Sequence, residues 1–157
     1  MRVFSTTEVP AVTTGLPVSS WAGNVANWRT MSRIVLPTID ELFMFSTMVV
    51  HARGRVTNDV GYNVGVGYHL WMYDANGSET FKQRKNWRKI SPSNGDNVNP
   101  QRHHMPLHQS AVFDMRSIVN PDYRPVVAFQ ADAHSTAAKK GNKLKVDNLG
   151  LLIVELH

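Results

Sequence analysis

The most regular pattern along the chain is an alternation of apolar with polar or small side chains. Between residues 62 and 73 the apolar positions Tyr62, Val64, Val66, Tyr68, Leu70 and Met72 fall on one face of an extended segment. Successive side chains of a β-strand point to opposite faces of a sheet, so the pattern predicts a strand over residues 61–74. Asn76-Gly77 follows it and indicates a hairpin, because both residues tolerate positive φ. The returning strand is expected over residues 78–84.

Further strands are expected over residues 2–6, 42–53, 110–118, 126–134 and 149–156. Thr38 and Glu41 match a helix capping box, so one helical turn is expected at residues 38–41. The β-branched and aromatic residues behind it favour a strand over a longer helix. This series of strands with turn signals between them predicts an all-β fold, an antiparallel β-sandwich or jelly roll, over residues 38–157.

Residues 1–37 lack a clear period and carry Pro10, Pro17 and Pro37 among many Ser and Thr residues. Proline fixes φ and removes a backbone donor, so this segment is predicted to be an extended N-terminal arm. Its irregularly spaced Phe4, Trp21 and Trp28 are candidate anchors on a partner, because burying a large apolar side chain is favourable. The alternative is that the arm supplies a strand to the sandwich of its own subunit.

The composition narrows the possible classes of protein. With 157 residues, 42% of them hydrophobic and 18% charged, the chain predicts one folded domain. It has no cysteine, which excludes disulfides, thiolate metal sites and cysteine nucleophiles. No apolar stretch approaches the roughly 18 residues of a membrane span, and no secretory signal is recognisable at the start of the chain. We therefore expect no membrane partner.

Basic residues outnumber acidic ones by 17 to 12, which gives a formal net charge of +5 and suggests an acidic partner. The densest basic run surrounds one tryptophan and comprises Lys82, Arg84, Lys85, Trp87, Arg88 and Lys89. Cations interleaved with aromatics can bind single-stranded nucleic acid, dock on an acidic protein, or protect an edge strand from pairing. No nucleic-acid-binding motif frames the run, so docking on a protein is the favoured interpretation and nucleic acid is not expected.

The candidate chemistry is sparse. His103, His104 and His108 could ligate a metal, but Pro106 excludes a helix there, and residues 91–107 are predicted to be a loop without metal. Gly65 and Gly67 lie inside a strand, where glycine indicates a close approach by another group and not a nucleotide loop. No motif for a hydrolase, a phosphate-binding loop or paired carboxylates is present, so a non-enzymatic protein without a cofactor is expected.

The order of elements carries a resemblance. A long strand pair at residues 42–53 and 61–74 precedes the strand at 110–118, and the turn Asn120-Pro121-Asp122-Tyr123 then leads to the strand at 126–134. The chain closes on an apolar strand with Gly150 near its start. This layout resembles the compact TNF/C1q-like jelly rolls of bacteriophage structural proteins, namely capsid decoration, head-fibre and tail-tip proteins.

The resemblance implies a virion structural protein that is made in the host cytoplasm and forms a homo-oligomer, a trimer in the related proteins. A capsid decoration or cement protein that docks on the major capsid protein is favoured, because only 37 residues precede the sandwich and leave no long fibre shaft. The alternative is a carbohydrate- or receptor-binding module of a tail tip. In that case Trp71, Tyr73, Trp87 and Tyr123 would offer rings for stacking on sugars.

Overall fold

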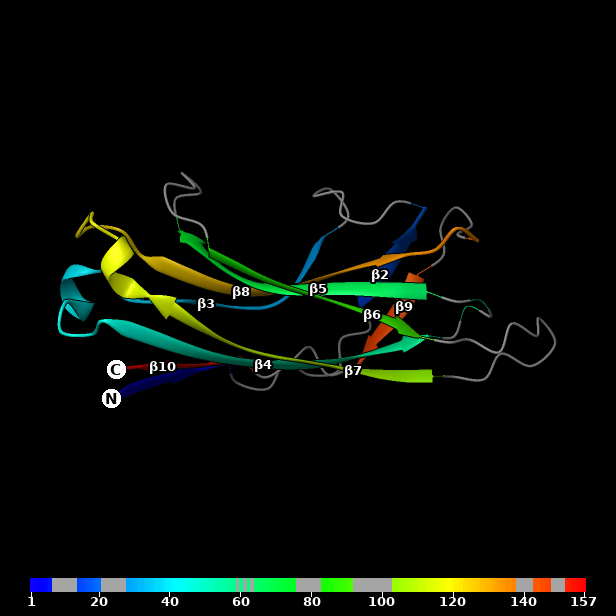
Figure 1. Ribbon diagram of the computed structural model, residues 1–157, viewed down its shortest axis with the longest axis horizontal. Coiled ribbons are helices and arrows are strands. Elements are labelled where there is room, and N and C mark those ends of the chain that lie inside the picture. Colours follow the sequence, from blue (N-terminus) through cyan, green and yellow to red (C-terminus); the bar gives the residue numbers. More distant parts are fainter. Residues whose placement is uncertain are drawn as a thin grey trace.

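The computed structural model describes residues 1–6, 14–20, 28–58, 60, 62, 64–75, 83–91, 103–137, 143–147 and 152–157. Two β-sheets lie face to face in this part of the chain (Figure 1). The strands are β1 (Arg2–Ser5), β2 (Thr14–Ser19), β3 (Arg29–Val35), β4 (Thr47–Asn58), β5 (Val64–Asp74), β6 (Gln83–Ser91), β7 (His103–Asp114), β8 (Pro125–His134), β9 (Lys143–Asp147) and β10 (Leu152–Leu156). Two short 3₁₀ helices, η2 (Asp40–Leu42) and η3 (Met115–Ser117), lie beside β4 and β7.

The first sheet is built around β4, which pairs with β7 along one edge and with β10 and then β9 along the other. The second sheet is built around β8, which lies between β3 and β5, and β6 pairs with the far edge of β5. The strand β2 pairs with β9 and, over two residues, in parallel with β8, so it joins the two sheets. The other pairings are antiparallel. The predicted all-β antiparallel sandwich is therefore confirmed.

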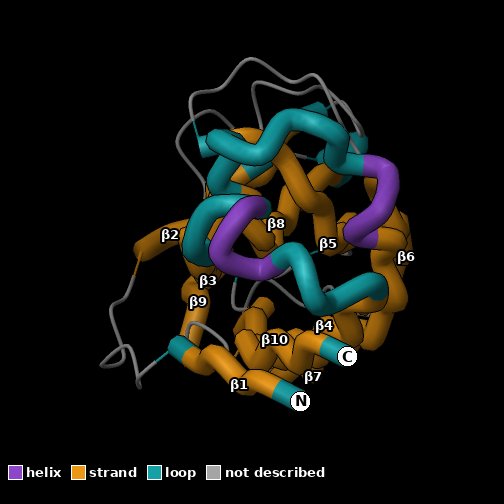
Figure 2. The backbone as a smooth tube through the Cα atoms, turned by 90° about the vertical axis from the view of Figure 1, so that its left-hand side faces the viewer, coloured by secondary structure: helices purple, strands orange, loops and turns teal. Residues whose placement is uncertain are grey.

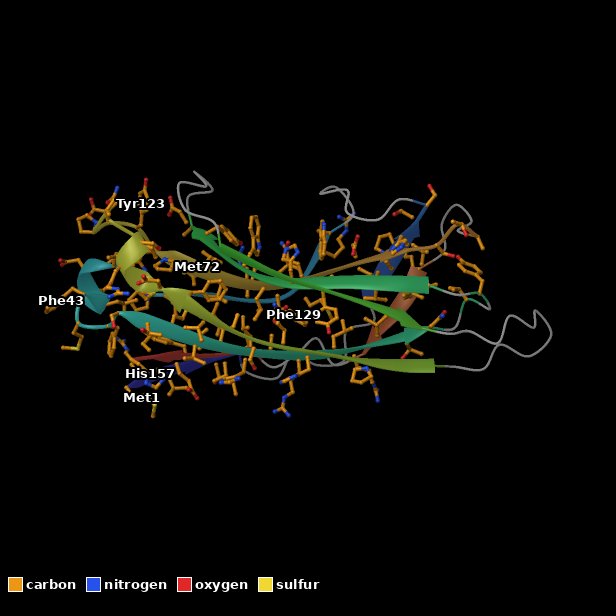
Figure 3. The ribbon with its side chains drawn as sticks, in the orientation of Figure 1. Met1, Phe43, Met72, Tyr123, Phe129 and His157 are labelled. Atoms are coloured by element: carbon orange, nitrogen blue, oxygen red, sulfur yellow. The ribbon has the colours of Figure 1, made fainter. Side chains whose placement is uncertain are left out.

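The core lies between the sheets and follows the period of two that the sequence displays. The side chains of Val64, Val66, Tyr68, Leu70 and Met72 on β5 are buried, as expected from the alternation. They face an inward set on β4 that includes Met48, Val50 and Ala52. The largest fully buried side chains are Phe113 and Phe129, and Figure 3 shows Phe129 between the two sheets.

The described parts of residues 1–37 form extended strands that are paired within the sandwich. The strand β1 pairs with β10, β2 with β9, and β3 with β8. Leu16, Val18 and Met31 are buried in the common core. The expectation that this segment lies outside the sandwich is therefore wrong for β1, β2 and β3. The alternative, that it supplies strands to its own subunit, is what the pairings show.

The sequence pattern did not predict β3, because the register of this strand shifts between Thr30 and Ser32, as at a β-bulge. The shift leaves Met31 and Ser32 both buried, so the alternation expected of a half-buried strand is broken there.

The pairing of β1 with β10 also brings the two ends of the chain side by side (Figures 1 and 2).

Other boundaries also differ from the expected ones. Residues 42–53 were expected to be one strand, but η2 ends at Leu42 and β4 begins only at Thr47. Residues 103–107 were expected in a loop and instead belong to β7, which pairs with the whole of β4. The long strands β4 and β5 lie in opposite sheets and not in one pair. An antiparallel return after β5 is present as β6, but it covers residues 83–91 and not the expected 78–84, and residues 76–82, with the Asn76-Gly77 turn, lie outside the described residues.

Candidate functional site

The candidate anchor Phe4 is held by its own subunit. It pairs in register with Val154 of β10 and packs, partly buried, against the core. The guanidinium carbon of Arg2 lies 4.9 Å from the centroid of its ring, a cation–π contact. Phe4 is therefore a part of the sandwich edge and not a free anchor. The second candidate anchor, Trp21, lies outside the described residues.

The third candidate, Trp28, stacks on the outward face of β5. Its ring centroid lies 4.0 Å from that of His69, and the row continues from His69 to Trp71 at 6.0 Å and from Trp71 to Tyr73 at 4.7 Å. These four rings are called the aromatic row. Aromatic neighbours at such distances attract one another beyond their simple burial, so the row fixes Trp28 on its own sheet.

Polar side chains of the neighbouring strands tie the aromatic row to the sheet. The Nε2 atom of His69 lies 3.0 Å from Oε1 of Gln130 on β8. The amide nitrogen of Gln130 donates to Oγ1 of Thr30 on β3 at 3.1 Å. With Oε1 as the acceptor, Nε2 of His69 carries the proton. The sequence did not single out His69, because its only signal was the alternation of β5.

The basic run falls at the edge of the second sheet. Arg84, Lys85, Trp87, Arg88 and Lys89 lie on β6, which ends the order of strands there, and Lys82 lies outside the described residues. An edge strand protected from pairing was one of the interpretations of the basic run, beside docking on a protein, and β6 has that edge position. A charged edge strand opposes unwanted pairing with another sheet.

The histidine string lies on β7. His103 and His104 pair with Asn58 and Thr57, and the exposed His108 pairs with Arg53. Across the described ranges, no three side chains of the His, Cys, Asp and Glu types gather where they could hold a metal ion. No helix in the described part of the chain has the length and apolar character needed to cross a membrane.

A serine and a histidine meet on the outward face of the first sheet. The Nδ1 atom of His51 on β4 lies 2.8 Å from Oγ of Ser110 on β7. A catalytic pair of this kind needs a third group that orients the imidazole. The cross-strand neighbour of His51 on its other side is Ile153 of β10, which has no polar side chain. The pair is a cross-strand contact between β4 and β7 on the outward surface of the sheet.

The strongest surface feature lies at one end of the sandwich. Figure 2 views the molecule from this end, where the two short helices lie. Phe43 and Met44, just after η2, are 79% and 70% exposed, and Val119, just after η3, is 90% exposed. Figure 3 shows Phe43 at the tip of the molecule. Such exposure of large apolar groups within two neighbouring loops is typical of a contact surface.

A hollow of about 190 Å³ lies at the same end. Its apolar lining comes from η2, η3 and the residues that follow them: Ile39, Leu42, Phe43, Phe45, Met115 and Ile118, with Arg116 as the polar member. We call this hollow, together with Phe43, Met44 and Val119, the apolar end.

Local hydrogen bonds fix the first loop of the apolar end. The backbone N–H and the hydroxyl of Thr38 donate to Oε2 of Glu41 at 3.0 and 2.9 Å, and the Glu41 N–H donates back to Oγ1 at 3.4 Å. This is the predicted capping box, and it confirms the turn at residues 38–41. The hydrogen bonds from Thr38 hold the pKa of Glu41 below its usual value.

The second loop is fixed by Asp114, which caps η3. Its carboxylate accepts from the backbone N–H of Arg116 at 3.0 Å and from Nε of that guanidinium at 2.9 Å. These bonds lower the pKa of Asp114. The loops are also joined to each other, since the Ile39 N–H donates to the Tyr123 carbonyl at 2.9 Å and the Asp40 N–H to that of Pro121 at 3.0 Å. The apolar side chains therefore project from a braced scaffold.

The sequence contained a signal for the apolar end that pointed to a different structure. The run Leu42-Phe43-Met44-Phe45 is apolar on every face and was interpreted as the start of a buried strand. The turn that the capping box begins continues through Leu42, so Phe43 and Met44 leave the sheet and point to solvent. A capping box followed directly by an unbroken apolar run is the signal that could have indicated an exposed loop.

The fold is similar to that of a viral capsid protein. Neither a family model nor a curated protein matches the sequence. Among solved structures, the infectious bursal disease virus particle matches 99% of this chain at a TM-score of 0.62 and 13% identity. The Gx strain of that virus matches 98% at a TM-score of 0.60 and 13% identity, and the VP2 subviral particle matches 99% at 0.57 and 13% identity.

The match covers nearly all of this chain but only a part of each neighbour. This chain spans about a third of those proteins, 31% of the first and 32% of the other two. At such low identity the likeness establishes the fold alone, a capsid-type β-sandwich. The expected relatives were TNF/C1q-like proteins of bacteriophages, whereas the structures matched are those of infectious bursal disease virus.

Proposed function

We propose that this protein is a non-enzymatic structural component of a virus particle. The observation that carries the proposal is the capsid-type sandwich, which matches 98–99% of the chain. The apolar end supports it, because a structural protein needs a surface that excludes water against a neighbour. The described surface offers a contact area of this kind at the apolar end.

Within the particle we propose the finer role of a capsid decoration or cement protein of a bacteriophage. The choice of a phage rests on the resemblance of the strand order. The net charge of +5 and the basic run on the edge strand β6 support docking on an acidic surface of the major capsid protein.

Electron microscopy of the native particle tests both levels of the proposal. Density for this sandwich on the particle is expected, at positions on top of a continuous shell, and particles that lack the protein should keep a closed shell. Assembly of the purified chain alone into closed shells would contradict the decoration role and keep the virion role. Purified particles without the protein would contradict both.

A carbohydrate- or receptor-binding role is the second candidate. The observation that favours it is the aromatic row, where half-buried Trp71 and Tyr73 lie 4.7 Å apart on the outward face of β5. Tyr123 instead packs against the core, and the side chain of Trp87 lies outside the described part. Binding to a glycan array that is lost in a Trp71→Ala variant with an unchanged melting temperature would favour this role over decoration.

A further inference from the structure

We infer that the apolar end is the surface by which copies of this chain contact one another around a symmetry axis of their assembly. The inference rests on the proposed structural role and names the partner of that surface. The occupant to which it commits is the apolar end of a second copy. Contact of this end with a different virion protein is the competing outcome, and the experiments below separate the two.

The first argument is the density of apolar exposure. Phe43, Met44 and Val119 are each at least 70% exposed, and they come from two loops that hydrogen bonds join to each other. Scattered single apolar residues on a surface need no explanation, but a contiguous group beside an apolar hollow does. The hollow is large enough to admit water, because its 190 Å³ exceeds the roughly 30 Å³ that one water occupies in the liquid. Its mainly apolar lining would offer that water few hydrogen-bond partners.

The second argument is shape. The apolar end carries projecting side chains and a hollow, since Phe43 is 79% exposed and also lines the cavity, and Met44 and Val119 directly follow the lining residues Phe43 and Ile118 in the sequence. A contact between two identical surfaces across a two-fold axis needs both halves of the fit on each copy, because residue i of one copy meets residue j of the other and j meets i. A surface that docks on an unrelated protein needs only one of the two halves.

The third argument is charge complementarity at the rim. Exposed residues of both signs surround the apolar end: Asp40, Glu41 and Asp122 are acidic, and Arg116 and Arg124 are basic. Arg124 is close enough to Glu41 to help hold its pKa down, so the signs alternate over short distances. A mixed rim of this kind can match itself after rotation. A surface that docks on an acidic partner would instead carry mainly basic charges, as the run on β6 does.

Cysteine cross-linking tests the contact directly, because the chain has no cysteine of its own. Single Met44→Cys and Val119→Cys variants of the full chain should form disulfide-linked dimers under mild oxidation, since each copy carries one thiol. The matched control is Val112→Cys, since Val112 is 58% exposed on the outward face of β7 in the first sheet and does not line the hollow. Linked species in the control alone, or in no variant, would overturn the inference.

Sedimentation of a double variant, Phe43→Ser with Val119→Ser, gives an independent reading. Self-association should weaken about tenfold or more, because two apolar groups would no longer be buried. Val112→Ser should leave it unchanged. If the double variant does not fold by circular dichroism, the cysteine variants decide alone. Unchanged self-association of a folded double variant would overturn the inference.

The failure of this inference can be told apart from the failure of the proposed function. A double variant that self-associates normally but no longer joins particles would assign the apolar end to another virion protein, which overturns the contact between copies and keeps the virion role. Absence of the unaltered protein from purified particles would remove the proposed function. Disulfide formation by Met44→Cys would still support the contact between copies in that case.

Discussion

The carboxylate of Asp132 occupies the space that a side chain at position 67 would need. Gly67 and Asp132 are paired across β5 and β8, and a Cβ atom on Gly67 would collide with Oδ1 of Asp132. Asp132 is only 2% exposed, so its carboxylate cannot swing into solvent without moving its neighbours. Gly65 is likewise paired with His134, and a Cβ atom on Gly65 would collide with the His134 ring. The glycines in this strand therefore serve close approach, as the sequence predicted.

Gly67→Ala is expected to lower the free energy of unfolding by about 1–3 kcal/mol, because overpacking a filled site forces side chains out of their preferred positions. Urea unfolding monitored by fluorescence would measure the loss. Combining it with Asp132→Ala should cost less than the sum of the two single variants, since the collision disappears. Strict additivity would show that Gly67 is required for another reason.

Trp28 is expected to stabilise its own subunit through the aromatic row. Trp28→Ala should lower the free energy of unfolding by about 1–3 kcal/mol, because it removes a half-buried ring that stacks on His69. The nearby exposed Arg29→Ala should cost less than about 0.5 kcal/mol. Both values come from denaturant unfolding of the purified chain. A Trp28→Ala variant with full stability but without particle binding would return Trp28 to the role of an anchor on a partner.

Glu41 makes stability depend on pH in a defined direction. Its pKa in the folded protein lies below the usual 4.5 because Thr38 donates two hydrogen bonds to the ionised carboxylate. The stabilisation is therefore fully present above pH 4.5 and is lost as the pH falls through the lowered pKa. Glu41→Gln should melt at a lower temperature than the unaltered protein at neutral pH, and this difference should shrink as the pH falls below 4.5 and through the lowered pKa.

Asp40→Asn is a suitable control for that comparison, because it neutralises the adjacent exposed carboxylate of η2. Its melting temperature should follow that of the unaltered protein more closely at every pH. Melting curves of the three proteins from neutral to acidic pH give the answer. A constant difference between Glu41→Gln and the unaltered protein over the whole range would show that ionisation of Glu41 is not involved.

The sequence predicted those elements whose signals are local. The alternation in β5, the capping box of Thr38 and Glu41, and the turn that begins at Asn120 all depend on neighbouring residues, and each is present in the structure. The Asn120 side chain accepts from the Asp122 N–H at 3.0 Å, which is the local bond that makes asparagine favourable in turns.

The joining of the two loops of the apolar end and the pairing of β1, β2 and β3 could not be predicted in this way, because both depend on distant parts of the chain. The backbone N–H groups of Ile39 and Asp40 donate to the carbonyls of Tyr123 and Pro121, which lie far away in the sequence. The short strand β1 is stable only because β10, at the other end of the sequence, offers an edge to pair with. Local propensity carries no information about either partner.

The contribution of residues 1–37 to the core leads to the last prediction. Met31 is 4% exposed on β3 and packs in the common core, while Val35, four residues later on the same strand, is 45% exposed. Met31→Ala should lower the free energy of unfolding by about 2–5 kcal/mol, because it leaves a cavity that the two sheets cannot close. Val35→Ala removes a solvent-facing group and should cost less than about 1 kcal/mol.

Equilibrium unfolding in urea measures both variants on the full chain, and an unchanged slope would confirm that the folded and unfolded states have kept their exposed areas. Equal, small losses for the two variants would mean that β3 can leave the sandwich without cost and that this segment is an independent arm after all. A large loss for Met31→Ala alone would show that β3 is held in the core of its own subunit and is not free to bind a particle.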